Sequence, residues 1–293
     1  MEARLRHSHS VSTQRLPSPE TMLRAHGLRP KKAWGQNFLR DGAVLDRIAA
    51  ALEASPDDLV VELGAGLGHL TSRLASTGAE VIAIERDRDL VAVLEDIFDG
   101  NSAVRVMAAD AKKVDLPALG AAGRRVLLAG NLPYHLTSPI LFNILDQREH
   151  LDRAVITVQK EVADRLVAVP GTKDYGVMSV HAQMWAEIRV AFDIAAGSFF
   201  PPPSVASSVI RLDPRGRPLA DPGDSMVFRQ VVRGAFSQRR KTIRNTLKSS
   251  GVAPVESLDS LLRRVELDPN ARPETIPIAG FARISRAIVE SQR

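Results

Sequence analysis

One short segment of this chain carries residues suited to activating an aromatic amine. Asn131, Leu132, Pro133 and Tyr134 directly follow an apolar run. The amino group of a base such as adenine is a poor nucleophile, because its lone pair is delocalised into the ring. Acceptors on the Asn131 side chain and the Leu132 carbonyl can draw that nitrogen towards tetrahedral geometry. Pro133 restricts the backbone so that this carbonyl points inward, and Tyr134 offers a flat face for an extruded base.

The same segment has a plainer interpretation, because Asn and Pro are both common where a strand turns into a helix. In the chemical interpretation, an amine that attacks an electrophilic methyl group becomes a strongly acidic ammonium and loses its proton readily. No strong general base is then required. Catalysis would rest on in-line positioning and on preorganised dipoles.

A glycine-rich loop at residues 62–68 (Glu-Leu-Gly-Ala-Gly-Leu-Gly) follows an earlier apolar run. A dinucleotide site would require Gly-x-Gly-x-x-Gly, and His69 stands where the third glycine belongs. The alternative ligand is a nucleoside that carries an amino acid and no phosphate. Gly64 would allow close backbone approach, Glu85 would accept from ribose hydroxyls, and Asp110 from an adenine amine. Each lies at the expected carboxyl end of a strand, where open sheets bind ligands.

The elements that must position these residues alternate along the chain. Buried strands are predicted at residues 59–63, 81–84, 104–107, 126–129 and 155–158, separated by helical segments such as 44–52. This order predicts an α/β fold with a parallel sheet covered on both faces. Residues 188–194 and 205–212 flank a Phe/Pro-rich connection and are predicted to form an antiparallel hairpin. Helices are expected over 226–249, 257–264 and 276–291.

Composition divides the chain into three parts. Residues 1–17 are rich in Ser, His and Arg and are predicted to be a disordered basic tail; an organelle transit peptide is the alternative interpretation. The Pro/Gly-rich segment at 213–223 separates a domain at 18–213 from a helical domain at 214–293. Ser18 followed by Pro19 predicts a short helix that starts the first domain.

Composition also excludes several classes of function. The 293 residues contain no cysteine, which rules out thiolate metal sites and a cysteine nucleophile. No apolar run approaches the ~18 residues of a membrane span, and the N-terminus lacks a secretory hydrophobic core. We therefore expect a cytoplasmic protein without a membrane partner.

The net charge of +5 is unevenly distributed. Residues 225–250 contain seven Lys/Arg and no acids, and residues 1–32 contain seven against two, whereas residues 33–224 are acidic overall. This segregation favours a polyanionic partner that is held away from the core. A solvated helix face is the alternative interpretation.

Taken together, these segments resemble the ribosomal RNA adenine N6,N6-dimethyltransferases of the KsgA family, from about residue 22 to the end. Residues 35–39 (Gly-Gln-Asn-Phe-Leu) match a family motif beside the cofactor site, and residues 131–134 match the motif of the reacting base. The resemblance implies a Rossmann-like class I methyltransferase with a mostly parallel seven-stranded sheet, S-adenosylmethionine as methyl donor and no metal. It also implies that Asn37 and Leu39 contact the methionine end of that cofactor, beside Gly64, Glu85, Asp110 and Asn131.

The resemblance extends to RNA binding. The Phe-Phe-Pro-Pro-Pro segment at 199–203 is similar to the family's second aromatic loop, so Phe199 or Phe200 could sandwich the base against Tyr134; both could instead be hairpin core. Residues 236–242 are similar to the family's basic helix, whose RNA-binding residues here would be Arg239, Arg240, Lys241 and Arg244. The implied substrate is two adjacent adenosines in a hairpin loop near the 3′ end of 16S rRNA, within the immature 30S subunit. The implied role is small-subunit biogenesis, and we expect a monomer.

Three other functions are compatible with the same scaffold. A 23S rRNA adenine methyltransferase of the antibiotic-resistance type usually carries Ile at the position of Leu132. A non-catalytic ribosome assembly factor would have no need of Glu85, Asp110 and Asn131. A DNA or protein amine methyltransferase would more often carry Pro in place of Leu132.

Overall fold

The computed structural model describes residues 16–121, 123–252 and 258–291. The predicted disordered tail at 1–17 therefore lies outside the described residues except for its last two. Leu16 packs beside Met22 and Leu23 on the body of the protein. The Pro17 carbonyl accepts a hydrogen bond of 2.8 Å from Nε2 of His69, so the residue that replaces the third glycine binds the N-terminal segment.

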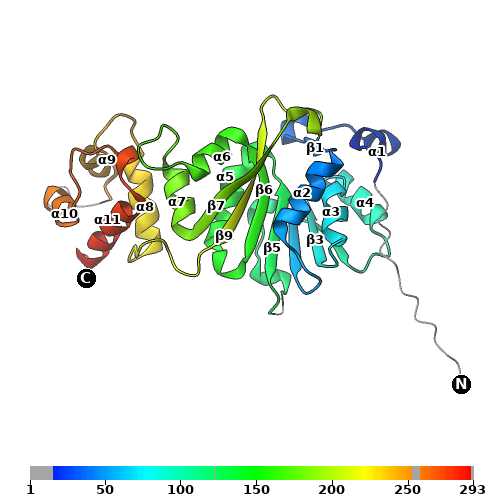
Figure 1. The fold of residues 1–293 in the computed structure, drawn as a ribbon, viewed down its shortest axis with the longest axis horizontal. Helices are drawn as coiled ribbons and strands as arrows, with labels where there is room; N and C mark the ends of the chain where they lie inside the picture. The colour runs from blue at the N-terminus through cyan, green and yellow to red at the C-terminus, as the bar shows by residue number, and fades with distance from the viewer. Residues whose placement is uncertain (1–15, 122, 253–257, 292–293) are drawn as a thin grey trace, which may run out of the picture.

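A seven-stranded sheet forms the centre of the molecule (Figure 1). Its order is β4-β3-β2-β5-β6-β9-β7. The first four pairs along this order are parallel, and β9 is antiparallel to both β6 and β7. The predicted mostly parallel sheet with an antiparallel hairpin is thus confirmed. The strands are β2 (Leu59–Leu63), β3 (Glu80–Glu85), β4 (Val104–Ala108), β5 (Val126–Asn131), β6 (Arg153–Gln159), β7 (Ala186–Ile194) and β9 (Ser207–Pro214).

Helices cover both faces of the sheet because successive strand residues point to opposite sides. Val60 of β2 packs with α2 and α3, whereas Val61 packs with α5, α6 and α7. Helix α4 packs on β3 and β4. The covering helices are α2 (Gly42–Leu52), α3 (His69–Ala75), α4 (Arg88–Ile97), α5 (Thr137–Asp146), α6 (Lys160–Val167) and α7 (Val177–Trp185).

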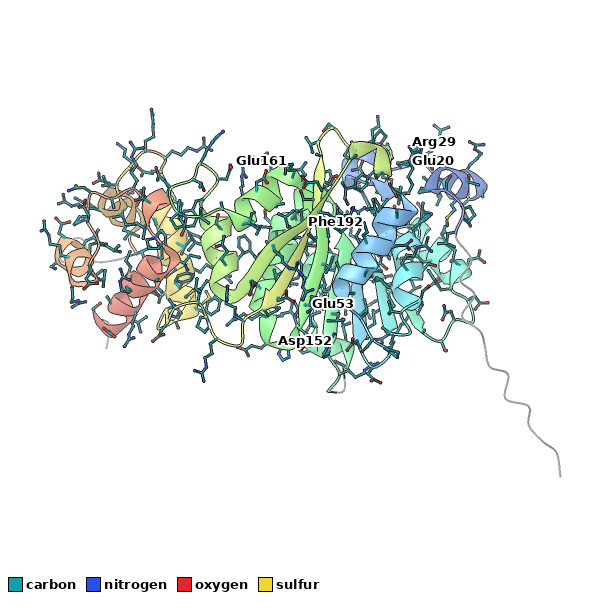
Figure 2. The ribbon with its side chains drawn as sticks, in the orientation of Figure 1. Glu20, Arg29, Glu53, Asp152, Glu161 and Phe192 are labelled. Atoms are coloured by element: carbon teal, nitrogen blue, oxygen red, sulfur yellow. The ribbon has the colours of Figure 1, made fainter. Side chains whose placement is uncertain are left out.

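A two-stranded sheet joins the N-terminal segment to the connection between β7 and β9. Strand β1 (Phe38–Leu39) pairs antiparallel with β8 (Phe199–Phe200), with Phe38 opposite Phe200 and Leu39 opposite Phe199. Helix α1 (Pro19–Ala25) precedes it and has the predicted Ser18 cap, whose side chain accepts from the Thr21 amide. Glu20 of α1 (labelled in Figure 2) forms a 2.6 Å ion pair with Arg40, which ties the helix to the end of β1.

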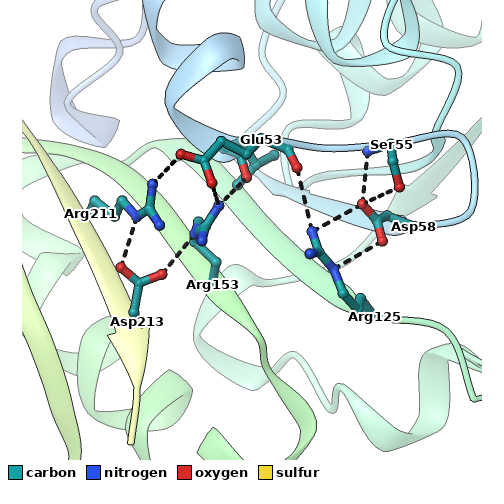
Figure 3. A network of polar contacts seen from close by, with 8 residues as sticks. Glu53, Ser55, Asp58, Arg125, Arg153, Arg211 and Asp213 are labelled. Atoms are coloured by element: carbon teal, nitrogen blue, oxygen red, sulfur yellow. Dashed lines mark hydrogen bonds and ion pairs between the residues drawn. The ribbon is translucent and has the colours of Figure 1, made fainter.

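Polar side chains tie α2 to the antiparallel part of the sheet. Glu53, which follows α2, binds Arg153 of β6 and Arg211 of β9, and Asp213 binds both of these arginines (Figure 3). Within the helix, the guanidinium of Arg47 lies 3.7 Å from the ring centroid of Phe192 on β7. These contacts brace the side of the sheet on which α2 packs.

The last four helices gather at one end of the molecule (Figure 1). They are α8 (Ser225–Ala235), α9 (Ile243–Ser250), α10 (Leu258–Arg264) and α11 (Ile278–Ser291). The expectation of one helix over 226–249 was wrong, because α8 ends at Ala235 and α9 starts only after Thr242. The Thr242 side chain caps α9 by accepting from the Asn245 amide, as Thr does at helix starts.

One apolar core runs through the helical part and the sheet. It includes Ile156 of β6, Phe228 of α8 and Phe281 of α11. The boundary between domains at residues 213 and 214 stays a prediction. Within the described ranges, no helix is both long and apolar enough to cross a bilayer.

Candidate active site

A cavity lies between the ends of the parallel strands and the segment at residues 34–38. It is lined by the glycine loop, by both predicted acids and by the predicted reactive segment. The structure therefore brings residues from four separate strand ends into one site. The lining residues from these parts are Trp34, Gly35, Gln36, Asn37, Phe38, Gly64, Gly66, Glu85, Arg86, Asp110, Asn131, Leu132, Pro133 and Tyr134.

The glycine loop needs glycine for two reasons. Gly64, Gly66 and Gly68 have φ of 74°, 61° and 80°, the left-handed region that other residues rarely adopt. A Cβ on Gly66 would lie 3.3 Å from the Phe38 ring, and one on Gly68 would lie 2.8 Å from the Phe98 ring. The backbone of the loop can therefore approach a ligand closely, and a Cβ at Gly66 or Gly68 would crowd the neighbouring ring.

Glu85 is the last residue of β3, and backbone amides hold its carboxylate in place. Oε2 accepts from the Gly66 amide at 2.9 Å, and Oε1 accepts from the amides of Arg86 and Asp87 at 2.8 Å each. The residue is buried, with 9% exposure, and it lines the cavity. These three hydrogen bonds fix the orientation of the Glu85 carboxylate before a ligand binds.

Asp110 lies two residues beyond the end of β4 and lines the same cavity. Its Oδ1 accepts from the Lys112 amide at 3.0 Å, and its Oδ2 lies 3.5 Å from Nζ of Lys112. The short helical turn at Ala111–Lys113 thereby orients the carboxylate. Both predicted acids belong to one cavity because β3 and β4 are parallel neighbours.

Asn131 closes β5, and its side-chain amide is already oriented. Nδ2 donates to the Asn37 carbonyl at 2.8 Å, so the amide oxygen is free to accept from another donor. In the turn that follows, the Leu136 amide donates to the Pro133 carbonyl at 2.9 Å. These bonds hold the 131–134 segment in a defined shape at the wall of the cavity.

The Tyr134 hydroxyl forms a 2.6 Å hydrogen bond with Oγ of Ser207 on β9. Burial raises the pKa of Tyr134 above its ordinary value, so the phenol stays protonated. With the hydroxyl occupied, the ring is held at the cavity wall. Stacking is the interaction that such a ring can offer a flat ligand.

Asn37 and Leu39 occupy different places. Asn37 lines the cavity and donates from Nδ2 to the Gly35 carbonyl at 3.1 Å. Leu39 is only 5% exposed and lines a smaller adjoining cavity that also reaches Gly64 and Asn131. Of this predicted pair, only Asn37 lies in the main cavity.

The assignment of Phe199 to the catalytic residues requires a correction. Phe199 is 1% exposed and packs in the apolar core with Leu39 and Ile194, so its ring offers no face to a base. Phe200 is partly exposed and pairs with Phe38, which does line the cavity. Alternation along β8 sends the two rings to opposite sides, and tertiary packing decides which is buried.

The predicted RNA-binding residues lie in the helical part, outside the cavity. Arg239, Arg240 and Lys241 are exposed in the loop between α8 and α9, where Arg240 has a φ of 63°. The basic helix predicted at 236–242 is therefore a loop. Arg244, on α9, forms a 2.7 Å ion pair with Asp259 of α10.

Sequence reasoning missed the pairing of Trp34 with Arg86, and both residues line the cavity. The Arg86 guanidinium lies 4.3 Å from the Trp34 ring centroid, and Nζ of Lys31 lies 5.0 Å from it. Lys31 in turn binds Oδ1 of Asp87 at 2.6 Å. The sequence could have indicated Arg86 as a site residue, because it directly follows Glu85, the acid at the end of a predicted strand.

Glu62, the one acid within β2, was also missed. Its side chain is 1% exposed and accepts a hydrogen bond from the Thr71 hydroxyl. Burial raises its pKa to about 8, despite the Thr71 hydrogen bond, and the nearby Glu85 adds to the rise. The signal was a single acid within an otherwise apolar strand, a type of residue that is seldom buried without a reason.

Comparison with known proteins gives consistent matches. The family described as "Ribosomal RNA adenine dimethylase" matches residues 27–290. The "Ribosomal RNA small subunit methyltransferase A" of Myxococcus xanthus (strain DK1622) is 47% identical over 274 residues, covering 93% of this chain and 96% of its own.

Two solved structures are similar in fold. A dimethyladenosine transferase from Plasmodium falciparum has a TM-score of 0.72 at 23% identity, covering 84% of this chain and 95% of that one. The 23S rRNA methyltransferase ErmE has a TM-score of 0.64 at 25% identity, covering 86% and 100%. The first of these likenesses concerns the fold alone.

Proposed function

The chain belongs to the ribosomal RNA adenine dimethylase family, and from that premise we propose that it transfers methyl groups to adenine N6 in small-subunit ribosomal RNA. The proposed substrate is a pair of adjacent adenosines in a hairpin loop near the 3′ end of 16S rRNA. The Myxococcus xanthus relative named above as a small-subunit methyltransferase supports this choice. The proposed donor is S-adenosylmethionine, and no metal takes part.

The single observation that carries the proposal is the shared cavity. It places the glycine loop, two carboxylates and the Asn131–Asn37 pair around one space. Glycines without Cβ atoms suit a ligand in contact with backbone, and two acids suit ribose hydroxyls and an adenine amine. These residues therefore fit S-adenosylmethionine, which would supply a methyl group on a sulfonium. Glu85 and Asp110 would hold its nucleoside, and Asn37 and Leu39 its methionine end.

The protein's own residues then activate the target base. The amide oxygen of Asn131 and the carbonyl oxygen of Leu132 accept from the two hydrogens of the adenine amine. This draws the nitrogen towards tetrahedral geometry and makes its lone pair available. Because Nδ2 of Asn131 is already bound, little reorganisation is needed during the reaction, which is how preorganised dipoles accelerate a step.

The base is held by stacking and the RNA by charge. The Tyr134 ring, fixed through Ser207, stacks on the extruded adenine, and Phe200 replaces Phe199 as the proposed second aromatic side chain. Arg239, Arg240 and Lys241 contact phosphates from an exposed loop. Arg244 contributes less, because Asp259 neutralises part of its charge.

A 23S rRNA target is the second candidate, since ErmE has the same fold. Leu132 and the helical part with its basic loop favour the small subunit. A role in small-subunit biogenesis accompanies the proposed activity, and the protein acts as a monomer in this proposal.

Mass spectrometry of small-subunit RNA from cells lacking this protein tests the proposal. We expect dimethyladenosine to be missing from the 3′ region of 16S rRNA and restored by the wild-type gene. Unchanged modification would refute the proposed function, as would transfer of methyl groups only to purified large subunits. Calorimetry with S-adenosylmethionine tests the cofactor separately.

A further inference from the structure

A second cavity lies where α5, α7 and α8 meet. It has a volume of about 240 Å³ and is lined by Phe142, Val177, His181, Arg229 and Arg233. It shares no lining residue with the active-site cavity. The volume is several times the ~30 Å³ that one water takes in the liquid, so the cavity can hold a ring-sized group.

His181 is buried in this cavity without a polar partner. The residue is 4% exposed, and its Nδ1 has no hydrogen-bond partner. Its ring meets the Phe142 ring edge-on, with centroids 5.0 Å apart. Buried polar atoms are almost always paired, so no internal hydrogen bond explains why a histidine stands at this position of the cavity wall.

Burial and the neighbouring arginines keep this imidazole neutral. Burial, followed by the charge of Arg229, lowers the pKa of His181 to about 4; Asp146 opposes this shift, and Arg148 and Arg233 add to it. At neutral pH the ring therefore offers one donor and one acceptor. That is the requirement for binding the edge of an uncharged base.

The cavity also has an unpaired cation. Arg229 forms an ion pair with Asp146, whereas Arg233, one turn further along α8, is exposed. Among the residues that the structure describes, none pairs with the Arg233 guanidinium. It lies in the acid-free stretch at 225–250. A free guanidinium beside an apolar cavity is suited to a phosphate.

We propose that the α5–α7–α8 cavity binds an unstacked nucleotide of the RNA substrate, with its base against Phe142 and His181 and its phosphate on Arg233. Flat rings, a neutral hydrogen-bonding group and a cation are how proteins bind single-stranded RNA. This inference rests on the proposed function, and it adds a second nucleotide site to the one at Tyr134.

The cavity lies within reach of the same RNA strand. Helix α5 begins at Thr137, three residues after Tyr134, and Phe142 is five residues further on. At a rise of about 1.5 Å per residue, Phe142 lies about 8 Å along the helix from its start. The proposed second nucleotide site therefore lies on the helix into which the reactive segment leads.

Two variants of the full chain test the proposal. Arg233→Ala removes the cation, and Val177→Phe fills the cavity without changing charge. The control is Arg189→Ala, which removes an exposed arginine on the sheet strand β7, outside the cavity. Each protein is titrated with a hairpin RNA that carries two adjacent adenosines in its loop, over a range of salt concentrations.

We expect Val177→Phe to weaken RNA binding at least fivefold, the low end for one lost base stack. Arg233→Ala should reduce the salt slope of log K by about 0.7–0.9, the value for one phosphate, and Arg189→Ala should not. Cross-linking with 4-thiouridine beside the target adenosines should label the peptides 137–146 or 177–185.

If the cavity is only a packing defect, Val177→Phe will raise the melting temperature and leave RNA affinity unchanged, and Arg233→Ala will match the control. Those results would overturn the proposal. The proposal would also be wrong if a free mononucleotide bound to the cavity but did not compete with binding of the hairpin RNA. Calorimetry with S-adenosylmethionine and methyl transfer by the wild type report on the proposed function separately, so the failure of one can be told from the failure of the other.

Discussion

Nδ2 of Asn131, at the end of β5, donates to the backbone carbonyl of Asn37, 94 residues earlier in the chain, at 2.8 Å. This bond joins the N-terminal segment to the strand end that carries the proposed reaction. Because the amide nitrogen of Asn131 is engaged in this bond, the amide oxygen is the atom that remains available to a substrate.

Replacing Asn131 by Ala removes the proposed acceptor for the adenine amine. We expect methyl transfer to slow by at least ~10²-fold, the scale for one preorganised hydrogen bond, with RNA affinity retained. Single-turnover transfer to small-subunit RNA measures the rate, and an RNA-binding titration is the control. Near-normal turnover would remove Asn131 from the mechanism.

Neutralising Arg239, Arg240 and Lys241 together should flatten the salt dependence of RNA binding. Each lost phosphate contact lowers the slope of log K against log salt by about 0.7–0.9. The loop is exposed, so the fold should tolerate the change. Arg286→Gln is the matched control, because Asp221 and Glu290 already pair with that arginine. An unchanged slope in the triple variant would make this loop a solvated surface only.

Glu62 should make the fold less stable as the pH rises. Its pKa is raised from 4.5 to about 8 in the folded chain, so between these values the folded state keeps a proton that the unfolded state has lost. Stability must then fall as the pH rises through this window. Glu62→Gln keeps an acceptor for Thr71 and should flatten the change in melting temperature between pH 5 and pH 9.

The control for this measurement is Glu95→Gln, which changes an exposed acid on α4. It should follow the wild-type pH profile. Identical profiles for Glu62→Gln and the wild type would show that Glu62 does not take up a proton on folding.

Trp34 should report cofactor binding through its fluorescence. The chain has two tryptophans, and only Trp34 lines the active-site cavity, stacked against Arg86. In a Trp185→Phe variant, the emission should therefore change when S-adenosylmethionine is added. Trp34→Phe should abolish that change. Calorimetric binding without any change in emission would mean that the ligand does not reach this wall.

Several features could be predicted from short stretches of sequence alone. The strands predicted at 59–63 and 126–129 are largely apolar runs that lead into Gly64 and Asn131, and such short runs are typical of buried strands. Parallel strands place their carboxyl ends together, so Gly64, Glu85, Asp110 and Asn131 were expected to meet, and they line one cavity. The cap at Ser18 was likewise evident, because a capping side chain binds the helix that it precedes.

Other features were decided only by packing between distant segments. Phe199 and Phe200 are adjacent and chemically identical, yet pairing of β8 with β1 buries the first and leaves the second partly exposed. The break at Phe236–Thr242 turned a predicted basic helix into a loop, because Thr242 caps a new helix there. The contacts of Asn37 with Asn131 and of Trp34 with Arg86, and the cavity around His181, join residues far apart in the chain. Local periodicity reports which side of an element is apolar, whereas the partner that covers that side depends on the whole chain.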